Sequence, residues 1–157
     1  MQQHYQRIIR DTEKRVLYFL KNQLQDQETM HHDGLMNQEQ FVDPKATIFL
    51  LADLAALYFN PKSRFYQDQK ALERVRAALD YEIRVQRPEG TFDYLSCNFQ
   101  SAPDTAFYTN RLVSLYKVVL KYAADPRYAW LKEKLYQIIE KAGYGMVKGG
   151  FHTPNHR

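Results

Sequence analysis

The chain has 157 residues, of which 45% are hydrophobic and 25% charged, a composition that is normal for a folded globular protein and excludes wholesale disorder. The 22 Lys and Arg outnumber the 18 Asp and Glu, but the basic residues are spread along predicted helix faces, so we expect no nucleic-acid partner. Cys97 is the only cysteine, which excludes an intrachain disulfide framework and a four-cysteine zinc site.

Apolar residues recur at helical spacing in five segments that are separated by the glycines and prolines of the chain. Segments 2–27, 65–86 and 127–142 are amphipathic, whereas 44–59 and 103–124 are apolar over most of their surface. No segment alternates with a period of two for long, so the sequence predicts an all-α fold. We expect the two apolar helices to form an inner layer and the three amphipathic helices an outer one.

A sequence repeat supports this arrangement. The pattern Thr-x-Phe-x4-Leu-x2-Leu-Tyr occurs at 47–58 and recurs at 105–116. The starts of the inner helices repeat as well, because an N-cap residue with a proline next to it or nearby occurs at 43–44, 101–103 and 153–154. We therefore predict helical hairpins of an incomplete (α/α) toroid with alternating outer and inner helices. Hairpin 1 covers about 1–60 and hairpin 2 about 61–125, while hairpin 3 begins in 126–157.

The candidate functional residues cluster in the connections that lead into the inner helices. If the inner helices are parallel, these connections meet at one end of the fold, where the positive ends of the helix dipoles favour an anion. Aromatic, amide, imidazole and guanidinium groups together suit a sugar ring and its polar substituents. The candidates are Tyr94, Asn98, Gln100, Tyr144, His152, Asn155, His156 and Arg157.

Three motifs in these connections resemble the N-terminal part of (α/α)-toroid carbohydrate-active enzymes, in particular the helical domain of heparinase II/III-like polysaccharide lyases. The motifs are Gly-Thr-Phe-Asp-Tyr at 90–94, Asn-Phe-Gln-Ser-Ala-Pro-Asp-Thr-Ala-Phe at 98–107, and Gly-Gly-Phe-His-Thr-Pro-Asn-His-Arg at 149–157. The resemblance implies cleavage of uronate-containing polysaccharides by β-elimination. In that family an Asn, His or Arg neutralises the uronate carboxylate, and a Tyr or His removes the C5 proton.

Carried over to this sequence, the resemblance implies specific roles. Asn98 or Asn155 would neutralise the carboxylate with help from Arg157, and His152 or His156 would act as a base. Tyr94 or Tyr144 would be an acid or a second base. Gln100 stands where the family pattern leads us to expect a His, so we assign it to substrate binding. We assign catalysis to His152, Asn155, His156 and Tyr94, and substrate binding to Asn98, Gln100, Tyr144 and Arg157.

Several of these residues also have structural interpretations. Asn98 and Asn155 are typical of turns and caps. His152 and His156 are separated by a proline and lack a nearby carboxylate at helical spacing, so we expect no metal and no cofactor. Asp53 and Arg111 occupy equivalent positions in the repeat, which predicts a salt bridge between the inner helices.

Two functional hypotheses follow. The first is the N-terminal portion of a carbohydrate-active enzyme, a polysaccharide lyase or a glycoside hydrolase when full length, inactive as this fragment and with an anionic polysaccharide or oligosaccharide as partner. The second is a non-enzymatic helical-repeat module that binds a protein or a glycan. In either case helix 103–124 lacks its next inner neighbour, so we expect self-association through this open edge.

The location is a separate expectation. The first residues lack the apolar core of a signal peptide, and the longest apolar run, 46–59, is too short to span a bilayer. We expect a cytoplasmic protein without a membrane partner, although members of the family that it resembles are often exported.

Overall fold

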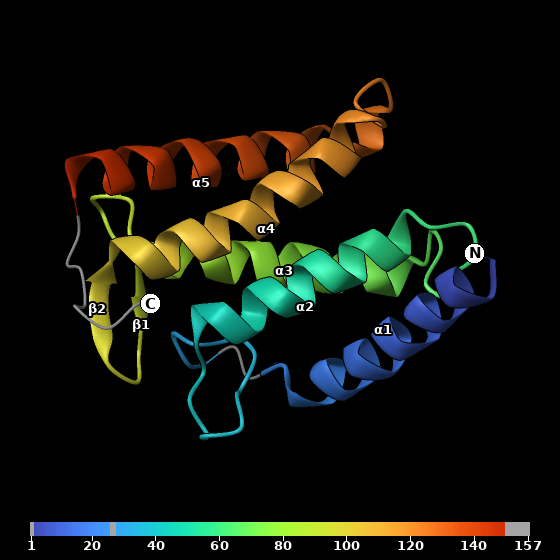
Figure 1. Cartoon of the computed structure of the whole chain (residues 1–157), viewed down its shortest axis with the longest axis horizontal. Helices are drawn as coiled ribbons and strands as arrows, with labels where there is room; N and C mark the ends of the chain where they lie inside the picture. Colours follow the sequence, from blue (N-terminus) through green and yellow to red (C-terminus); the bar gives the residue numbers. More distant parts are fainter. Residues whose placement is uncertain (1, 26–27, 150–157) are drawn as a thin grey trace.

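The computed structural model describes residues 2–25 and 28–149. The described chain is mostly helical, as predicted (Figure 1). Its elements are α1 (Gln2–Asn22), α2 (Pro44–Tyr58), α3 (Gln69–Val85), β1 (Phe92–Tyr94), β2 (Asn98–Ser101), α4 (Ala102–Leu120), a 3-10 turn (Pro126–Tyr128) and α5 (Ala129–Lys148).

Helices α2 and α4 pack side by side and run in the same direction, whereas α1, α3 and α5 run the opposite way (Figure 1). Helix α3 packs against α2, α5 packs against α4, and α1 covers a further side of α2. The starts of α2 and α4 therefore lie at the same end of the molecule, together with the β1–β2 hairpin (Figure 1). Among the described residues, no helix is both long enough and apolar enough to cross a bilayer.

The hydrophobic core lies between α2 and the helices that pack against it. Helix α2 is buried over most of its surface, with Ile48, Leu50, Leu51 and Leu54 all completely buried, because helices contact it on three sides. The outer helices bury one face only, as their amphipathic sequences predict. Tyr58, Phe59, Tyr122 and Tyr128 form an aromatic cluster near the opposite end of the inner helices, where the Tyr58 and Tyr128 hydroxyls are 3.2 Å apart.

The sequence repeat is also a repeat of local structure. Thr47 in the first turn of α2 donates its hydroxyl hydrogen to the Asp43 carbonyl and accepts a hydrogen bond from the Leu35 backbone N–H. Thr105 in α4 makes the equivalent pair of bonds, to the Ser101 carbonyl and from the Phe92 N–H. Each threonine thus attaches the incoming connection to the first turn of an inner helix.

The N-caps repeat in the same way. The Asp43 carboxylate accepts a hydrogen bond from the Ala46 N–H, and the Ser101 hydroxyl accepts one from the Asp104 N–H. These bonds satisfy backbone donors that have no partner within the helix. The predicted starts of the two inner helices are therefore confirmed to within one residue.

Four predicted helix boundaries were wrong. Helix α4 ends at Leu120 rather than near 124, because the N–H groups of the next three residues bond to carbonyls three residues back, as in a turn. Helix α1 ends at Asn22, because the following residues pair with the returning chain: Leu24 N–H donates to the Gly34 carbonyl. Helix α3 begins at Gln69, where the Asp68 side chain caps it. Helix α5 continues to Lys148, beyond the predicted end at 142, because its glycines are tolerated within the helix.

The connection 88–102 also holds a short antiparallel hairpin that the sequence analysis did not predict. Phe92 of β1 is paired with Ser101 of β2, and Tyr94 with Asn98. Strands of three and four residues are too short for a period of two to be visible in the sequence. The hairpin leads directly into α4 and so fixes Tyr94 next to the start of that helix.

Candidate functional site

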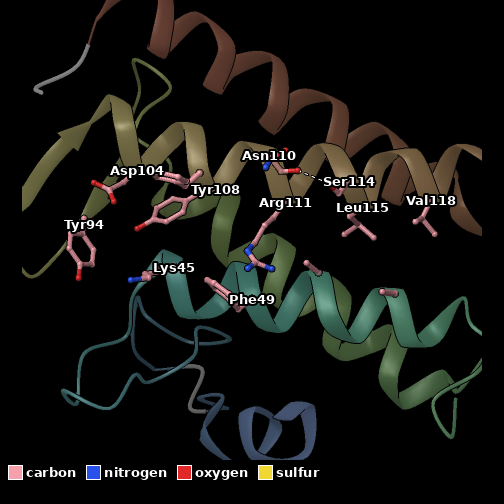
Figure 2. Close-up of a pocket in the computed structure, with 13 residues that line it drawn as sticks. Lys45, Phe49, Tyr94, Asp104, Tyr108, Asn110, Arg111, Ser114, Leu115 and Val118 are labelled. Atoms are coloured by element: carbon pink, nitrogen blue, oxygen red, sulfur yellow. Dashed lines mark hydrogen bonds between the residues drawn. The ribbon is translucent and has the colours of Figure 1, made fainter. Parts of the chain in front are cut away.

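A groove of about 740 Å³ runs between the two inner helices, and we call it the α2–α4 groove (Figure 2). Lys45 and Phe49 line it from α2, Arg111 and Leu115 from α4, and Tyr94 from β1. Its volume lies within the range typical of small-molecule sites. The groove begins at the N-terminal ends of α2 and α4. The sequence analysis predicts the catalytic and substrate-binding residues at this end.

The side chain of Arg111 crosses the groove to the neighbouring inner helix (Figure 2). Its guanidinium carbon lies 3.6 Å from the centroid of the Phe49 ring, a close cation–π contact. The contact thus places a guanidinium, which carries N–H donors along its edge, in the wall of the groove. Such an edge can donate two parallel hydrogen bonds to a carboxylate or a sulfate.

A second cation lies nearer to the hairpin. The Lys45 ammonium is 4.9 Å from the centroid of the Tyr94 ring. Lys45 is in the first turn of α2, and Tyr94 ends β1. This contact therefore joins the start of α2 to the hairpin that leads into α4. Of the predicted catalytic residues, Tyr94 is the one that lies within the described residues, and it lines the wall of the groove.

Asp104 is the acidic residue in the groove lining, and its surroundings are those of a helix cap. It is buried in the first turn of α4, where the Ser101 hydroxyl donates to its carboxylate at 2.5 Å. The Asn98 side chain donates to the Ser101 hydroxyl at 2.6 Å and to the Asp104 carboxylate at 3.4 Å. Asn98, a predicted substrate-binding residue, is therefore buried within the cap network, in agreement with its structural interpretation.

Two buried titratable side chains, one in the groove lining and one in α3, have oxygens without a hydrogen-bond partner among the described residues. They are the Tyr108 hydroxyl and both carboxylate oxygens of Glu82, which comes from α3. Burial raises the pKa of Glu82 well above its usual value, and the negative charge of Asp43 raises it further. Burial likewise raises the pKa of Tyr108. Burial therefore favours the neutral form of the Glu82 carboxyl group.

The other predicted site residues are not gathered in this groove. Gln100 has a left-handed backbone (φ 53°), which is held by a hydrogen bond from its N–H to the Asp93 carboxylate. Tyr144 is on α5 with 62% of its surface exposed and is not among the residues that line the groove. His152, Asn155, His156 and Arg157 lie outside the described residues.

The predicted salt bridge between Asp53 and Arg111 is wrong. Asp53 instead pairs with Arg15 of α1 at 2.7 Å, and Arg111 stacks on Phe49. Helix α1 covers the side of α2 on which Asp53 lies, so the carboxylate finds its partner there. In the part of the chain that the structure describes, no three His, Cys, Asp or Glu residues are placed so that they could hold a metal ion.

The sequence analysis missed several residues that line the groove, among them Lys45, Phe49, Tyr108 and Arg111, and it did not single out the buried Glu82. For Glu82 a signal exists, because it follows Val75 and Leu79 at helical spacing and so lies on the buried face of α3. For the groove residues the signal is weaker. A helix that is apolar nearly all round does not reveal which of its faces borders a groove.

Comparison with protein-family models, with curated proteins and with solved structures finds no match to this chain. The proposed function therefore rests on the geometry of the α2–α4 groove.

Proposed function

We propose that this chain is the helical part of a carbohydrate-active enzyme of the polysaccharide lyase type, and that the α2–α4 groove binds an acidic sugar unit. The observation that carries the proposal is the stacking of Arg111 on Phe49, 3.6 Å apart, in the wall of the groove. The ring holds the guanidinium in one orientation, so less entropy is lost when its N–H edge binds a carboxylate.

The charges in the groove also favour an anion. Of the side chains that line it, Lys45 and Arg111 are cationic and Asp104 is acidic. The positive ends of the α2 and α4 dipoles lie at the same end of the groove (Figure 1). The exposed Phe107 ring, which also lines the groove, offers an apolar surface on which the face of a sugar ring can pack.

The lyase part of the proposal rests on Tyr94. In β-elimination a base removes the C5 proton of the uronate, a double bond forms between C4 and C5, and the bond from C4 to the leaving oxygen breaks. Tyr94 lines the groove with the Lys45 ammonium over its ring. In the proposed mechanism Tyr94 exchanges a proton with a sugar unit that extends from Arg111 towards the hairpin end of the groove. His152, Asn155 and His156 keep the roles that the family resemblance implies for them.

The binding part is tested by titrating the chain with uronate oligosaccharides from hyaluronan, alginate and pectin, with an uncharged oligosaccharide of equal length as the reference. We expect Arg111→Ala to weaken uronate binding roughly 10- to 100-fold, as the loss of hydrogen bonds between charged groups predicts. Arg76→Ala is the matched control, because Arg76 also stacks on an aromatic ring, 4.2 Å from Trp130, but lies on α3 outside the groove. Equal losses in both variants, or no uronate binding at all, would contradict the proposal.

The lyase part is tested by the ultraviolet absorbance of the unsaturated uronate that β-elimination creates. We expect binding without turnover from these 157 residues, and turnover from a longer chain that completes the toroid. Tyr94→Phe in that longer chain should abolish turnover while leaving uronate affinity unchanged. Turnover that survives this substitution would remove Tyr94 from the mechanism.

A non-enzymatic module that binds a protein segment is the second candidate, and the apolar half of the groove favours it. Ala52, Ala56 and Val118 line the groove beyond Arg111, in the direction of the helix C-termini. An amphipathic peptide with acidic residues could place its apolar side there. Val118→Asp should prevent such a peptide from binding, whereas a uronate disaccharide at Arg111 should bind as before.

A further inference from the structure

A second hollow, of about 290 Å³, adjoins the α2–α4 groove on the side of α1, and we call it the α1-side hollow. Tyr18 and Phe19 of α1 form one wall. Asn37 and Glu39 line it from the connection that precedes α2, and Ser96 from the turn of the β hairpin.

The two hollows share Lys45, Phe49 and Tyr94. These shared side chains lie between the two hollows, and among them the Lys45 ammonium is 4.9 Å from the centroid of the Tyr94 ring. Lys45 is exposed, and its charge is carried on a flexible four-carbon chain. A single exposed cation–π contact is weak, so a ligand can displace the ammonium and occupy both hollows at once.

From this continuity we infer that the ligand site crosses the start of α2, so that a linear acidic oligosaccharide occupies the α2–α4 groove with one unit and the α1-side hollow with the next. The inference rests on the proposed binding of an acidic sugar at Arg111. It adds that the site accepts a chain of several units and that Tyr18 contacts the units beyond the first.

The chemistry of the α1-side hollow suits a sugar unit. The Tyr18 ring is 54% exposed and offers a flat apolar surface. Beside it, the Ser96 hydroxyl donates to the Glu39 carboxylate at 2.9 Å, and the Asn37 amide donates to the Asp43 carboxylate. Ser96 and Glu39 are exposed and can exchange partners with sugar hydroxyls, whereas Asp43 is buried as the N-cap of α2. The carboxylates of Glu39 and Asp43 also mean that the unit bound here is better uncharged.

The experiment compares hyaluronan disaccharide with hyaluronan hexasaccharide, because acidic and uncharged units alternate in this polymer. We expect the wild-type chain to bind the hexasaccharide more tightly. Tyr18→Ala should weaken hexasaccharide binding roughly two- to tenfold and leave disaccharide binding unchanged, as the loss of one ring contact predicts. Tyr66→Ala is the matched control, because Tyr66 is similarly exposed, at 41%, and lines neither hollow.

Amide chemical shifts locate the ligand directly. The hexasaccharide should shift the backbone amide signals of Glu39 and Ser96 as well as those near Arg111, whereas the disaccharide should shift only the latter. Equal affinity for both lengths with no shift at Glu39 and Ser96 would overturn the inference and leave the proposed function standing. A Tyr18→Ala loss that is equal for both lengths would also overturn it. If neither saccharide binds in an Arg111-dependent manner, the proposed function itself fails.

Discussion

Phe49 and Phe107 occupy the same position in the two halves of the repeat, but their surroundings differ. Arg111 of α4 lies on the Phe49 ring at 3.6 Å, whereas 67% of the Phe107 surface is exposed. The difference arises because α4 covers α2 on this side, while among the described residues no further inner helix covers α4. Phe107, which borders the α2–α4 groove, therefore keeps an apolar ring exposed to solvent.

The first prediction concerns self-association through this exposed ring. We expect the chain to associate as its concentration rises, because burial of an exposed Phe removes apolar surface from water. Phe107→Lys should shift the chain towards the monomer in sedimentation equilibrium. Phe99→Lys is the control, since Phe99 is 56% exposed on β2 and does not line the groove. A wild-type chain that stays monomeric at all concentrations would refute the prediction.

The second prediction concerns Glu82 and pH. Its pKa is raised in the folded state, so its neutral form is the one that folding favours. The stability that it contributes is complete below the unfolded pKa, near 4.5, and is lost as the pH rises towards the folded pKa. We therefore expect the contribution of Glu82 to the free energy of unfolding to fall as the pH rises above about 4.5.

Substitution separates this residue from the other titrating groups. Glu82→Gln should flatten that part of the pH profile in urea unfolding experiments. Glu82→Met should raise the free energy of unfolding at pH 7 by about 1 to 3 kcal/mol, because it removes a buried polar group without a partner. Glu73→Gln on the exposed face of α3 is the control. An unchanged pH profile in Glu82→Gln would show that Glu82 does not titrate as we expect.

A structural feature can be predicted from the sequence when it leaves a recognisable pattern in that sequence. Helical periodicity reports burial, so the helices and the burial of α2 over most of its surface could be predicted. The start of α3 depends on one side-chain bond from Asp68, and the β1–β2 hairpin is too short to show a period. Neither leaves a periodic signal.

The groove is harder still to predict. Phe49 and Arg111 come from different helices and meet only because α2 and α4 pack side by side. Equivalence in the repeat pointed to Asp53 as the partner of Arg111, but the packing of α1 against α2 gave Asp53 a different cation, Arg15. Tyr94 could be predicted because a connection into an inner helix must lie at the common end of these helices.

The third prediction concerns the two repeated threonines. Thr105→Val keeps the shape of the side chain but leaves the buried Phe92 N–H without its acceptor, which should cost about 1 to 3 kcal/mol of stability. Thr47→Val should cost a similar amount through the Leu35 N–H. Thr109→Val is the control, because the buried Thr109 hydroxyl only donates, to a carbonyl in its own helix. Denaturant unfolding measures all three, and equal losses would show that the N–H acceptor role is not what matters.

The last prediction uses two glycines of α5 that differ only in their surroundings. A Cβ at Gly145 would lie 2.8 Å from the Gly90 carbonyl carbon and 2.9 Å from the Glu89 carbonyl oxygen, whereas a Cβ at Gly143 would meet nothing within 4 Å. Gly143→Ala should therefore raise the free energy of unfolding by about 1 kcal/mol through helix propensity. Gly145→Ala should lower it, because backbone atoms of the connection before β1 cannot move aside without disturbing the hairpin. Thermal and urea unfolding compare the two variants directly. If Gly145→Ala stabilised the chain as much as Gly143→Ala, α5 would not pack against residues 89–91 as described, and the position of the hairpin that carries Tyr94 would have to be revised.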